Sequence, residues 1–268
     1  MIVFSHANSF SAGTYRRLFE GWRAAGQEVV AVERYGHGLE QPIGSNWRGM
    51  TQQLLALIDS LPAPRVWLVG HSMGGFLSLI AAGLRPKRVH GIVLLDAPIV
   101  SGWKSGMVAV MKATGQMHRI PIAAGAMRRR NRWASLEDVH AHFSQKPQFA
   151  AWHPEVLRDY VETGTEVDPH DGTGMARRLS FRRDVESVIY ATTPHWLVPF
   201  LHRHPLGGPV AFIGGRNSRE MKQAGLAATR RITHGRISWL DGSHLFPFEL
   251  PDETAREVLG WIKRLEGL

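Results

Sequence analysis

The sequence predicts an α/β fold built on one mostly parallel sheet with helices on both faces. Short apolar runs alternate with segments of helical periodicity, the pattern of parallel strands joined by crossover helices. The chain of 268 residues is 44% hydrophobic and 21% charged, which is typical of a globular protein. A chain of this length buries enough surface to hold a core without a disulfide or a structural metal.

The first half of the chain shows a regular succession of strands and helices. An abrupt apolar run predicts a strand at Ile2–Ser5. The spacing of leucine and aromatic residues predicts a helix at Thr14–Ala25, which ends at Gly26. Further strands are predicted at Glu28–Glu33, Arg65–Gly70 and Val89–Asp96, with helices at Asn46–Ser60 and Phe76–Leu84 between them.

The alternation is interrupted after Pro98 for about a hundred residues, far longer than a usual connection. We therefore predict a core formed by residues 1–98 and 196–268, with residues 99–195 as a helical cap insertion. The alternation resumes with strands at Pro209–Gly214 and Arg236–Leu240 and helices near Arg219–Thr229 and at Asp252–Leu265.

Composition excludes several kinds of site. The chain has no cysteine, which excludes a disulfide framework, an iron–sulfur site and a cysteine nucleophile. The 14 histidines show no third ligand at metal-site spacing, so neither a metal nor another cofactor is predicted.

The net charge of +9 is spread along the chain, except that the stretch Lys104–Arg132 lacks Asp and Glu. We interpret that stretch as a solvated helix face, and no nucleic-acid partner is predicted. No long apolar run and no secretory signal is found, which favours a cytoplasmic protein without an integral membrane segment.

The most informative motif is Gly70-His71-Ser72-Met73-Gly74-Gly75, which follows an apolar strand and opens an apolar helix. This context is typical of a nucleophile elbow, in which a strained turn exposes the serine hydroxyl at the sheet edge. Glycines on both sides remove the Cβ atoms that would collide at such a turn. The helix N-terminus would also direct the N–H of Met73 at the reacting oxygen.

A serine hydroxyl is a weak nucleophile without a neighbouring base. The segment Asp241-Gly242-Ser243-His244-Leu245 follows the last predicted strand. Its glycine-containing loop would allow His244 to reach across the sheet edge. We therefore predict that His244 is the base for Ser72.

Taken together, these segments resemble the α/β-hydrolase superfamily, as a serine hydrolase of the esterase type with a cap insertion. The resemblance covers residues 1–98 and roughly 205–268, and it is specific for the fold and the serine chemistry but weak for the substrate. Four segments carry it: Phe4-Ser5-His6-Ala7-Asn8, Glu33-Arg34-Tyr35-Gly36-His37-Gly38, the elbow, and the sequence GSHLFPFELP around His244.

The resemblance implies an oxyanion hole formed by the backbone N–H groups of Asn8 and Met73, with Ala7 in place of the usual glycine. It also implies that the sheet lacks the first two strands of the superfamily. The strand at Glu28–Glu33 would then lie at the sheet edge, where its charges blunt the edge or where it pairs in a homodimer.

The acidic member of the predicted triad departs from the family pattern. Gly214-Gly215-Arg216-Asn217 places an amide where the superfamily usually has a carboxylate. Some family members take the acid from the end of the strand after the elbow strand, and here that residue is Asp96. We therefore predict the triad Ser72, His244 and Asp96, with Glu220, Asp241 and the neutral Asn217 as alternatives.

The predicted function is a carboxylic ester hydrolase that acts on a small molecule through an acyl-enzyme on Ser72. The alternatives are a carbon–carbon bond hydrolase or an acyltransferase with the same residues, and a catalytically decayed ligand-binding member. The cap should cover Ser72 and set substrate choice, with Trp103 and Met107 among its candidate pocket residues.

Overall fold

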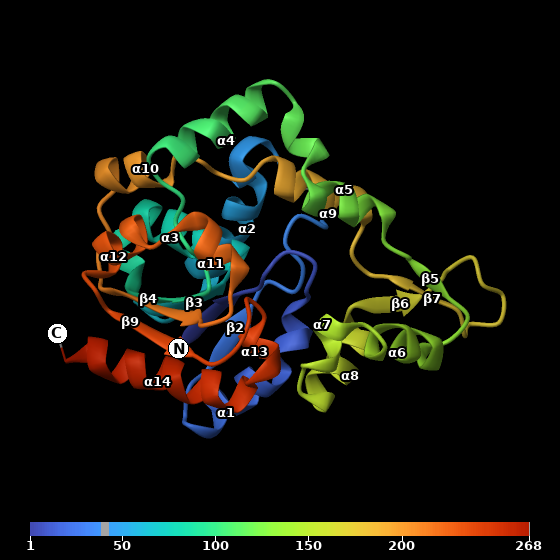
Figure 1. Cartoon of the computed structure of the whole chain (residues 1–268). Helices are drawn as coiled ribbons and strands as arrows, with labels where there is room; N and C mark the ends of the chain where they lie inside the picture. Colours follow the sequence, from blue (N-terminus) through green and yellow to red (C-terminus); the bar gives the residue numbers. More distant parts are fainter. Residues whose placement is uncertain (39–42, 268) are drawn as a thin grey trace.

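The computed structural model describes residues 1–38 and 43–267 and contains a central sheet of six strands (Figure 1). The strand order is β2-β1-β3-β4-β8-β9, and every neighbouring pair is parallel. These data confirm the predicted α/β class. The strands are β1 (Ile2–Ser5), β2 (Val29–Ala31), β3 (Val66–His71), β4 (Val89–Leu95), β8 (Val210–Gly215) and β9 (Ile237–Leu240).

Alternating side chains of the strands pack into two separate cores, one on each face of the sheet. Phe4 belongs to the core that includes α1 (Arg16–Ala24) and α14 (Pro251–Glu266). The adjacent Val3 belongs to the opposite core. That second core includes residues of α2 (Arg48–Ser60), α3 (Met73–Leu84), α10 (Leu197–Arg203) and α12 (Ala227–Thr233).

Two predicted elements differ in length from the observed ones. The helix expected near Arg219–Thr229 is broken into α11 (Arg219–Ala224) and α12, because Gly225 between them adopts a φ of +82°. The edge strand β2 is only three residues long. A short edge strand offers little surface for pairing, and a homodimer through this edge stays a prediction.

The segment between β4 and β8 contains a small antiparallel sheet that the sequence did not predict. Its order is β5-β7-β6, and its strands are two or three residues long, too short to show a periodicity. In Figure 1 this part projects to the right of the main sheet. The helices and strands between β4 and α10 are α4 (Trp103–Ala113), α5 (Pro121–Arg128), β5 (Arg132–Trp133), α6 (Leu136–Ser144), α7 (Pro147–Ala150), α8 (Pro154–Thr163), β6 (Thr165–Val167), β7 (Arg177–Leu179) and α9 (Arg183–Ala191).

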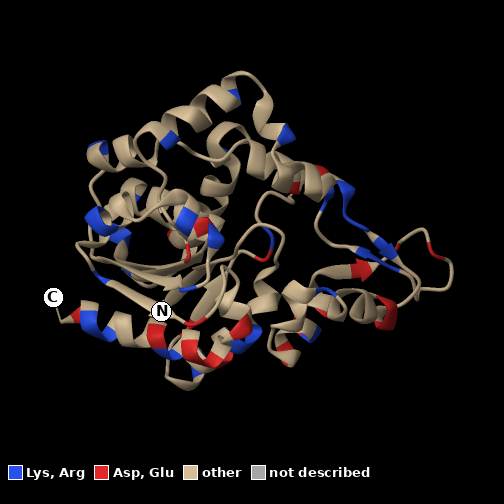
Figure 2. Ribbon diagram, viewed as in Figure 1, with Lys and Arg blue, Asp and Glu red and all other residues tan. Residues whose placement is uncertain are grey.

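Shorter helices complete the described chain. The 3₁₀ turns are Ala12–Tyr15, Ser45–Trp47, Pro86–Arg88 and Gln116–Arg119, and the helix α13 spans Phe246–Glu249. Basic segments occur both on the α/β part and on the segment between β4 and β8 (Figure 2). Within residues 1–38 and 43–267, no helix combines the length and the hydropathy needed to cross a membrane.

Candidate active site

Ser72 lies in a strained turn between β3 and α3. Its backbone has a φ of +51°, and α3 begins at the next residue. The turn depends on its glycines, because a Cβ on Gly70 would lie 2.3 Å from the Gly74 carbonyl oxygen. A Cβ on Gly74 would lie 1.9 Å from the Ser5 carbonyl oxygen. Only glycine allows these close approaches, so the sequence determines the turn that carries the hydroxyl.

His244 lies in the loop after β9 and faces Ser72 across the sheet edge. Its Nε2 is 3.0 Å from the Ser72 Oγ, and its side chain is 18% exposed. The hydroxyl is thus in position to pass its proton directly to the imidazole ring.

Asp96 is fully buried and holds the other side of the same ring. Its Oδ2 is 2.6 Å from the His244 Nδ1, which is a hydrogen-bond distance. Its Oδ1 accepts the N–H of Gly215 at 2.9 Å, and its Oδ2 accepts the hydroxyl of Ser218 at 2.5 Å. These donors compensate the burial of a carboxylate. The backbone of Asp96 is also strained, with a φ of +40°.

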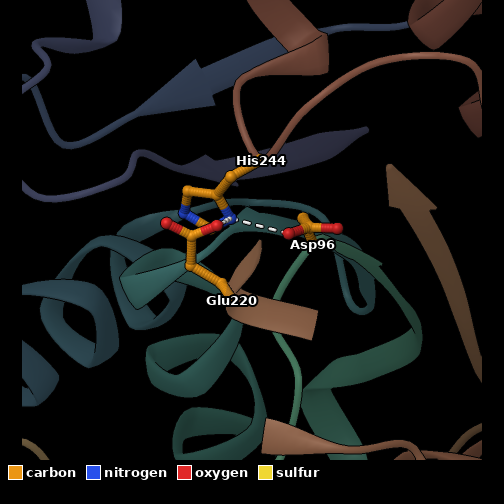
Figure 3. A group of neighbouring side chains, drawn as sticks. All are labelled: Asp96, Glu220 and His244. Atoms are coloured by element: carbon orange, nitrogen blue, oxygen red, sulfur yellow. Dashed lines mark hydrogen bonds and ion pairs between the residues drawn. The ribbon is translucent and has the colours of Figure 1, made fainter. Parts of the chain in front are cut away.

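The other candidates for the acid occupy different positions. Figure 3 shows Glu220 beside the ring of His244, with Asp96 joined to the ring by a hydrogen bond. The Glu220 Oε2 is 4.0 Å from Nδ1, and its side chain is 46% exposed. Neither Asp241 nor the side chain of Asn217 contacts the ring among the hydrogen bonds of the described residues. Side chains of types that can bind a metal ion also cluster here, namely Asp96, Glu220 and His244. The 2.6 Å contact between the Asp96 Oδ2 and the His244 Nδ1 is a hydrogen bond.

Two residues predicted to supply backbone N–H groups lie at the cavity in front of Ser72. Asn8 and Met73 line the cavity there together with Ser72 and His244. Neither N–H donates to an acceptor within the described chain. Both donors are therefore free to bind an oxygen atom of a ligand.

The orientation of the Asn8 N–H is fixed by His6. The Nε2 of His6 accepts the N–H of Tyr35 at 2.9 Å, so its proton resides on Nδ1. That Nδ1–H donates to the Ala7 carbonyl at 2.7 Å. Because a trans peptide directs its C=O and N–H to opposite sides, this bond aims the Asn8 N–H away from His6.

A buried hydrogen-bond chain connects this loop with the His244 loop. The N–H of Ala7 donates to the Tyr15 hydroxyl at 3.1 Å, which leaves that hydroxyl to donate to the His71 Nδ1 at 2.7 Å. The His71 Nε2–H then donates to the carbonyl of His244 at 2.9 Å. Burial lowers the pKa of His71 well below its ordinary value, which keeps the ring neutral as this pattern requires.

Acid should weaken the fold through His6. Burial lowers the pKa of His6 to about 4. Above pH 6.5 the ring is neutral in both the folded and the unfolded state, whereas between pH 6.5 and about 4 only the unfolded chain takes up a proton on this ring. We expect a loss of about 2 kcal/mol in the free energy of unfolding between pH 7.5 and 5 from this group. Urea unfolding of the wild-type protein at both pH values measures this loss. If the free energy of unfolding of His6→Asn had the same pH dependence as that of the wild type, His6 would not be the cause.

The cavity over Ser72 has a volume of about 460 Å³ and walls from both parts of the chain. Ala7, Phe76 and Leu245 come from the sheet-bearing part, whereas Gln148 and Tyr190 come from the segment between β4 and β8. A second, mostly apolar cavity of about 580 Å³ also reaches Ser72 and His244, and Trp103 and Met107 line it.

Sequence reasoning missed Ser218, Tyr15 and His71 as parts of this site. Ser218 also caps α11 through its Oγ, which accepts the N–H of Met221 at 3.2 Å. A serine before a helix is a recognisable capping signal. No local pattern, however, shows that its hydroxyl reaches Asp96.

The chain matches the model of the alpha/beta hydrolase family over residues 2–257. It is 28% identical to a putative non-heme haloperoxidase of Mycobacterium phage D29, covering 95% of this chain and 84% of that protein. It is 26% identical to the sn-1-specific diacylglycerol lipase ABHD11 of Mus musculus, covering 86% of this chain and 70% of that protein.

Solved structures show the same architecture. The structure of E-2-(acetamidomethylene)succinate hydrolase matches with a TM-score of 0.71 and 20% identity. The match covers 98% of this chain and 91% of that one, and at this identity it shows the fold alone. Family model, relatives and fold agree: the chain belongs to the alpha/beta hydrolase family.

Proposed function

We propose that the protein is a serine hydrolase that cleaves carboxylic esters through an acyl-enzyme on Ser72. The observation that carries this proposal is the continuous line from the Ser72 hydroxyl through His244 to the buried Asp96, with distances of 3.0 and 2.6 Å. The free N–H groups of Asn8 and Met73 beside that hydroxyl support it, as does the lipase among the relatives.

In the acylation step, the Ser72 Oγ attacks the ester carbonyl while its proton passes to the His244 Nε2. The carbonyl oxygen becomes an anion and receives the N–H groups of Asn8 and Met73. Asp96 stabilises the imidazolium that forms. His244 then gives the proton to the leaving alcohol as the carbon–oxygen bond breaks.

Deacylation repeats these roles with water as the nucleophile. His244 accepts a proton from the water as its oxygen attacks the acyl carbon, and returns that proton to Ser72 when the acid leaves. The open cavity in front of Ser72 admits both the ester and the water.

Labelling with a fluorophosphonate tests the proposal. We expect the wild-type protein to be labelled on Ser72 and to lose ester hydrolysis in proportion. A protein that hydrolyses esters without being labelled, or that is labelled elsewhere, would contradict it. A catalytically decayed ligand-binding protein would not be labelled by the probe and would not hydrolyse esters. A panel of esters and β-diketones separates ester hydrolysis from carbon–carbon bond hydrolysis.

We expect the apolar cavity at Trp103 and Met107 to bind an apolar part of the substrate. The side chains of Trp103 and Met107 are both largely exposed to solvent and both line this cavity. Met107→Gln should therefore lower kcat/KM for a nitrophenyl octanoate about tenfold more than for the acetate. Met175 is also exposed and lies outside this cavity, so Met175→Gln supplies the control. An equal loss on both esters would argue against this role.

Tyr15 is a positioning residue in this proposal, because its hydroxyl joins the Ala7 and His71 groups. Tyr15→Phe removes two hydrogen bonds worth roughly 0.5–1.5 kcal/mol each, so we expect kcat to fall about tenfold while KM stays constant. Binding of a trifluoromethyl ketone that mimics the tetrahedral intermediate should weaken in parallel.

Tyr35→Phe is the matched control for Tyr15→Phe. Tyr35 is also fully buried, and the variant loses one hydrogen bond of its hydroxyl, at 2.9 Å to the Ser5 hydroxyl. That hydroxyl is not part of the hydrogen-bond chain from Ala7 to His244. If the two variants lost equal kcat and equal thermal stability, Tyr15 would have only a structural role.

A further inference from the structure

A larger cavity adjoins the one over Ser72 on the side of the segment between β4 and β8. Its volume is about 960 Å³, and Phe10, Gln148 and Tyr190 line both cavities. Because the two spaces share these walls, a ligand bound at Ser72 can extend into the larger one.

Some of the charges around this larger cavity already have partners. The Arg129 guanidinium contacts the buried Glu186 at 2.5 Å and donates to the Tyr160 hydroxyl at 2.8 Å. The Glu249 carboxylate accepts both the N–H and the hydroxyl of Ser243. The charge of Arg129 is therefore neutralised by Glu186, whereas Glu249 keeps its negative charge and is held in place by Ser243.

Lys146, by contrast, lies in this wall with no counter-ion among the residues that the structure describes. Its side chain is partly buried, and its ammonium lies 5.0 Å from the centre of the Phe143 ring. Within the described residues it makes no ion pair. Burial and the positive charge of Arg129 lower the pKa of Lys146. A partly buried ammonium near a guanidinium is unfavourable until an anion joins it.

Arg219 adds a second cation to the same wall. It lines both cavities and, within residues 1–38 and 43–267, also forms no ion pair. Its neighbour Glu220 lines the cavity over Ser72 and lies beside His244, and is absent from the lining of the larger cavity. The larger cavity thus offers two cations that form no ion pair with a described carboxylate, and one carboxylate, that of Glu249, so that these three side chains leave a net positive charge.

We propose that the larger cavity binds a carboxylate group of the substrate through Lys146, with Arg219 contributing a second positive charge. The preferred esters would then carry a free carboxylate on the part that extends away from Ser72. This inference rests on the proposed function, because it concerns the substrate of the same site.

Two matched pairs of esters test the inference, one for each side of the scissile bond. On the acyl side, 4-nitrophenyl hydrogen glutarate is compared with its neutral methyl ester. On the alcohol side, 4-acetoxybenzoate is compared with its methyl ester. For at least one pair, we expect the wild-type protein to show a kcat/KM about tenfold higher for the substrate with the free carboxylate than for its methyl ester. High salt should reduce this ratio.

Lys146→Met keeps the packing on Phe143 and removes the charge, and it should reduce that carboxylate preference about tenfold. Lys87→Met changes the net charge equally at an exposed position outside the larger cavity, and should keep the wild-type preference. If neither pair favoured the carboxylate, or if Lys146→Met kept the preference, the inference would be wrong. Continued hydrolysis of the neutral esters in those cases would leave the proposed function intact, whereas no hydrolysis of any ester would defeat both.

Discussion

Ser72→Ala should lower ester turnover by about 10⁶-fold, the usual cost of removing the nucleophile of a triad. The variant removes only the Oγ that lies 3.0 Å from the His244 Nε2. Because alanine fits the same turn, the free energy of unfolding should change little. Stopped-assay kinetics with a nitrophenyl ester and a thermal melt measure the two effects.

Ser218→Ala is a useful comparison for Ser72→Ala, since it also removes one hydroxyl near the site. That hydroxyl donates to Asp96 and does not contact the His244 ring. We expect Ser218→Ala to retain most of the turnover. Wild-type rates in purified Ser72→Ala would refute the nucleophile assignment.

Asp96→Asn should lower turnover by about 10⁴-fold, as loss of the buried carboxylate does in the serine protease template. His244 becomes a cation in the transition state, and in a site of low dielectric an adjacent carboxylate stabilises it strongly. An asparagine would also place an NH2 donor toward the ring where the carboxylate has an acceptor oxygen. The kcat of the purified variant measures the effect.

Two further variants separate the candidates for the acid. Glu220 is half-exposed and 4.0 Å from Nδ1, so Glu220→Gln should cost far less than Asp96→Asn. Asn217→Ala removes a neutral side chain that makes no described contact with the ring, and should cost least. A larger loss in Glu220→Gln than in Asp96→Asn would reassign the acid.

The sequence predicts the sheet and the candidate residues Ser72 and His244 because their signals are local. The elbow glycines exclude any bulkier residue, and His244 follows an apolar strand in a loop with Gly242. These two signals need no knowledge of distant contacts. The prediction of Asp96 also needs the family resemblance, in which some members take the acid from the end of the strand after the elbow strand.

The remaining features depend on contacts between residues far apart in the chain. Tyr15 reaches His71 over 56 positions, and Ser218 reaches Asp96 over 122. The β5–β7 pairing joins two strands of two and three residues, which are too short to show the alternation or the residue composition typical of strands. Tertiary packing rather than local preference determines these features.

Trapping of the acyl-enzyme tests directly whether Ser72 is the nucleophile. The wild-type protein would be mixed with a slowly hydrolysed nitrophenyl ester, quenched in acid and digested for mass spectrometry. We expect a burst of nitrophenol equal to the enzyme concentration and an acyl group on the peptide that contains Ser72. Steady turnover of the same ester with no acyl group on Ser72 would contradict it.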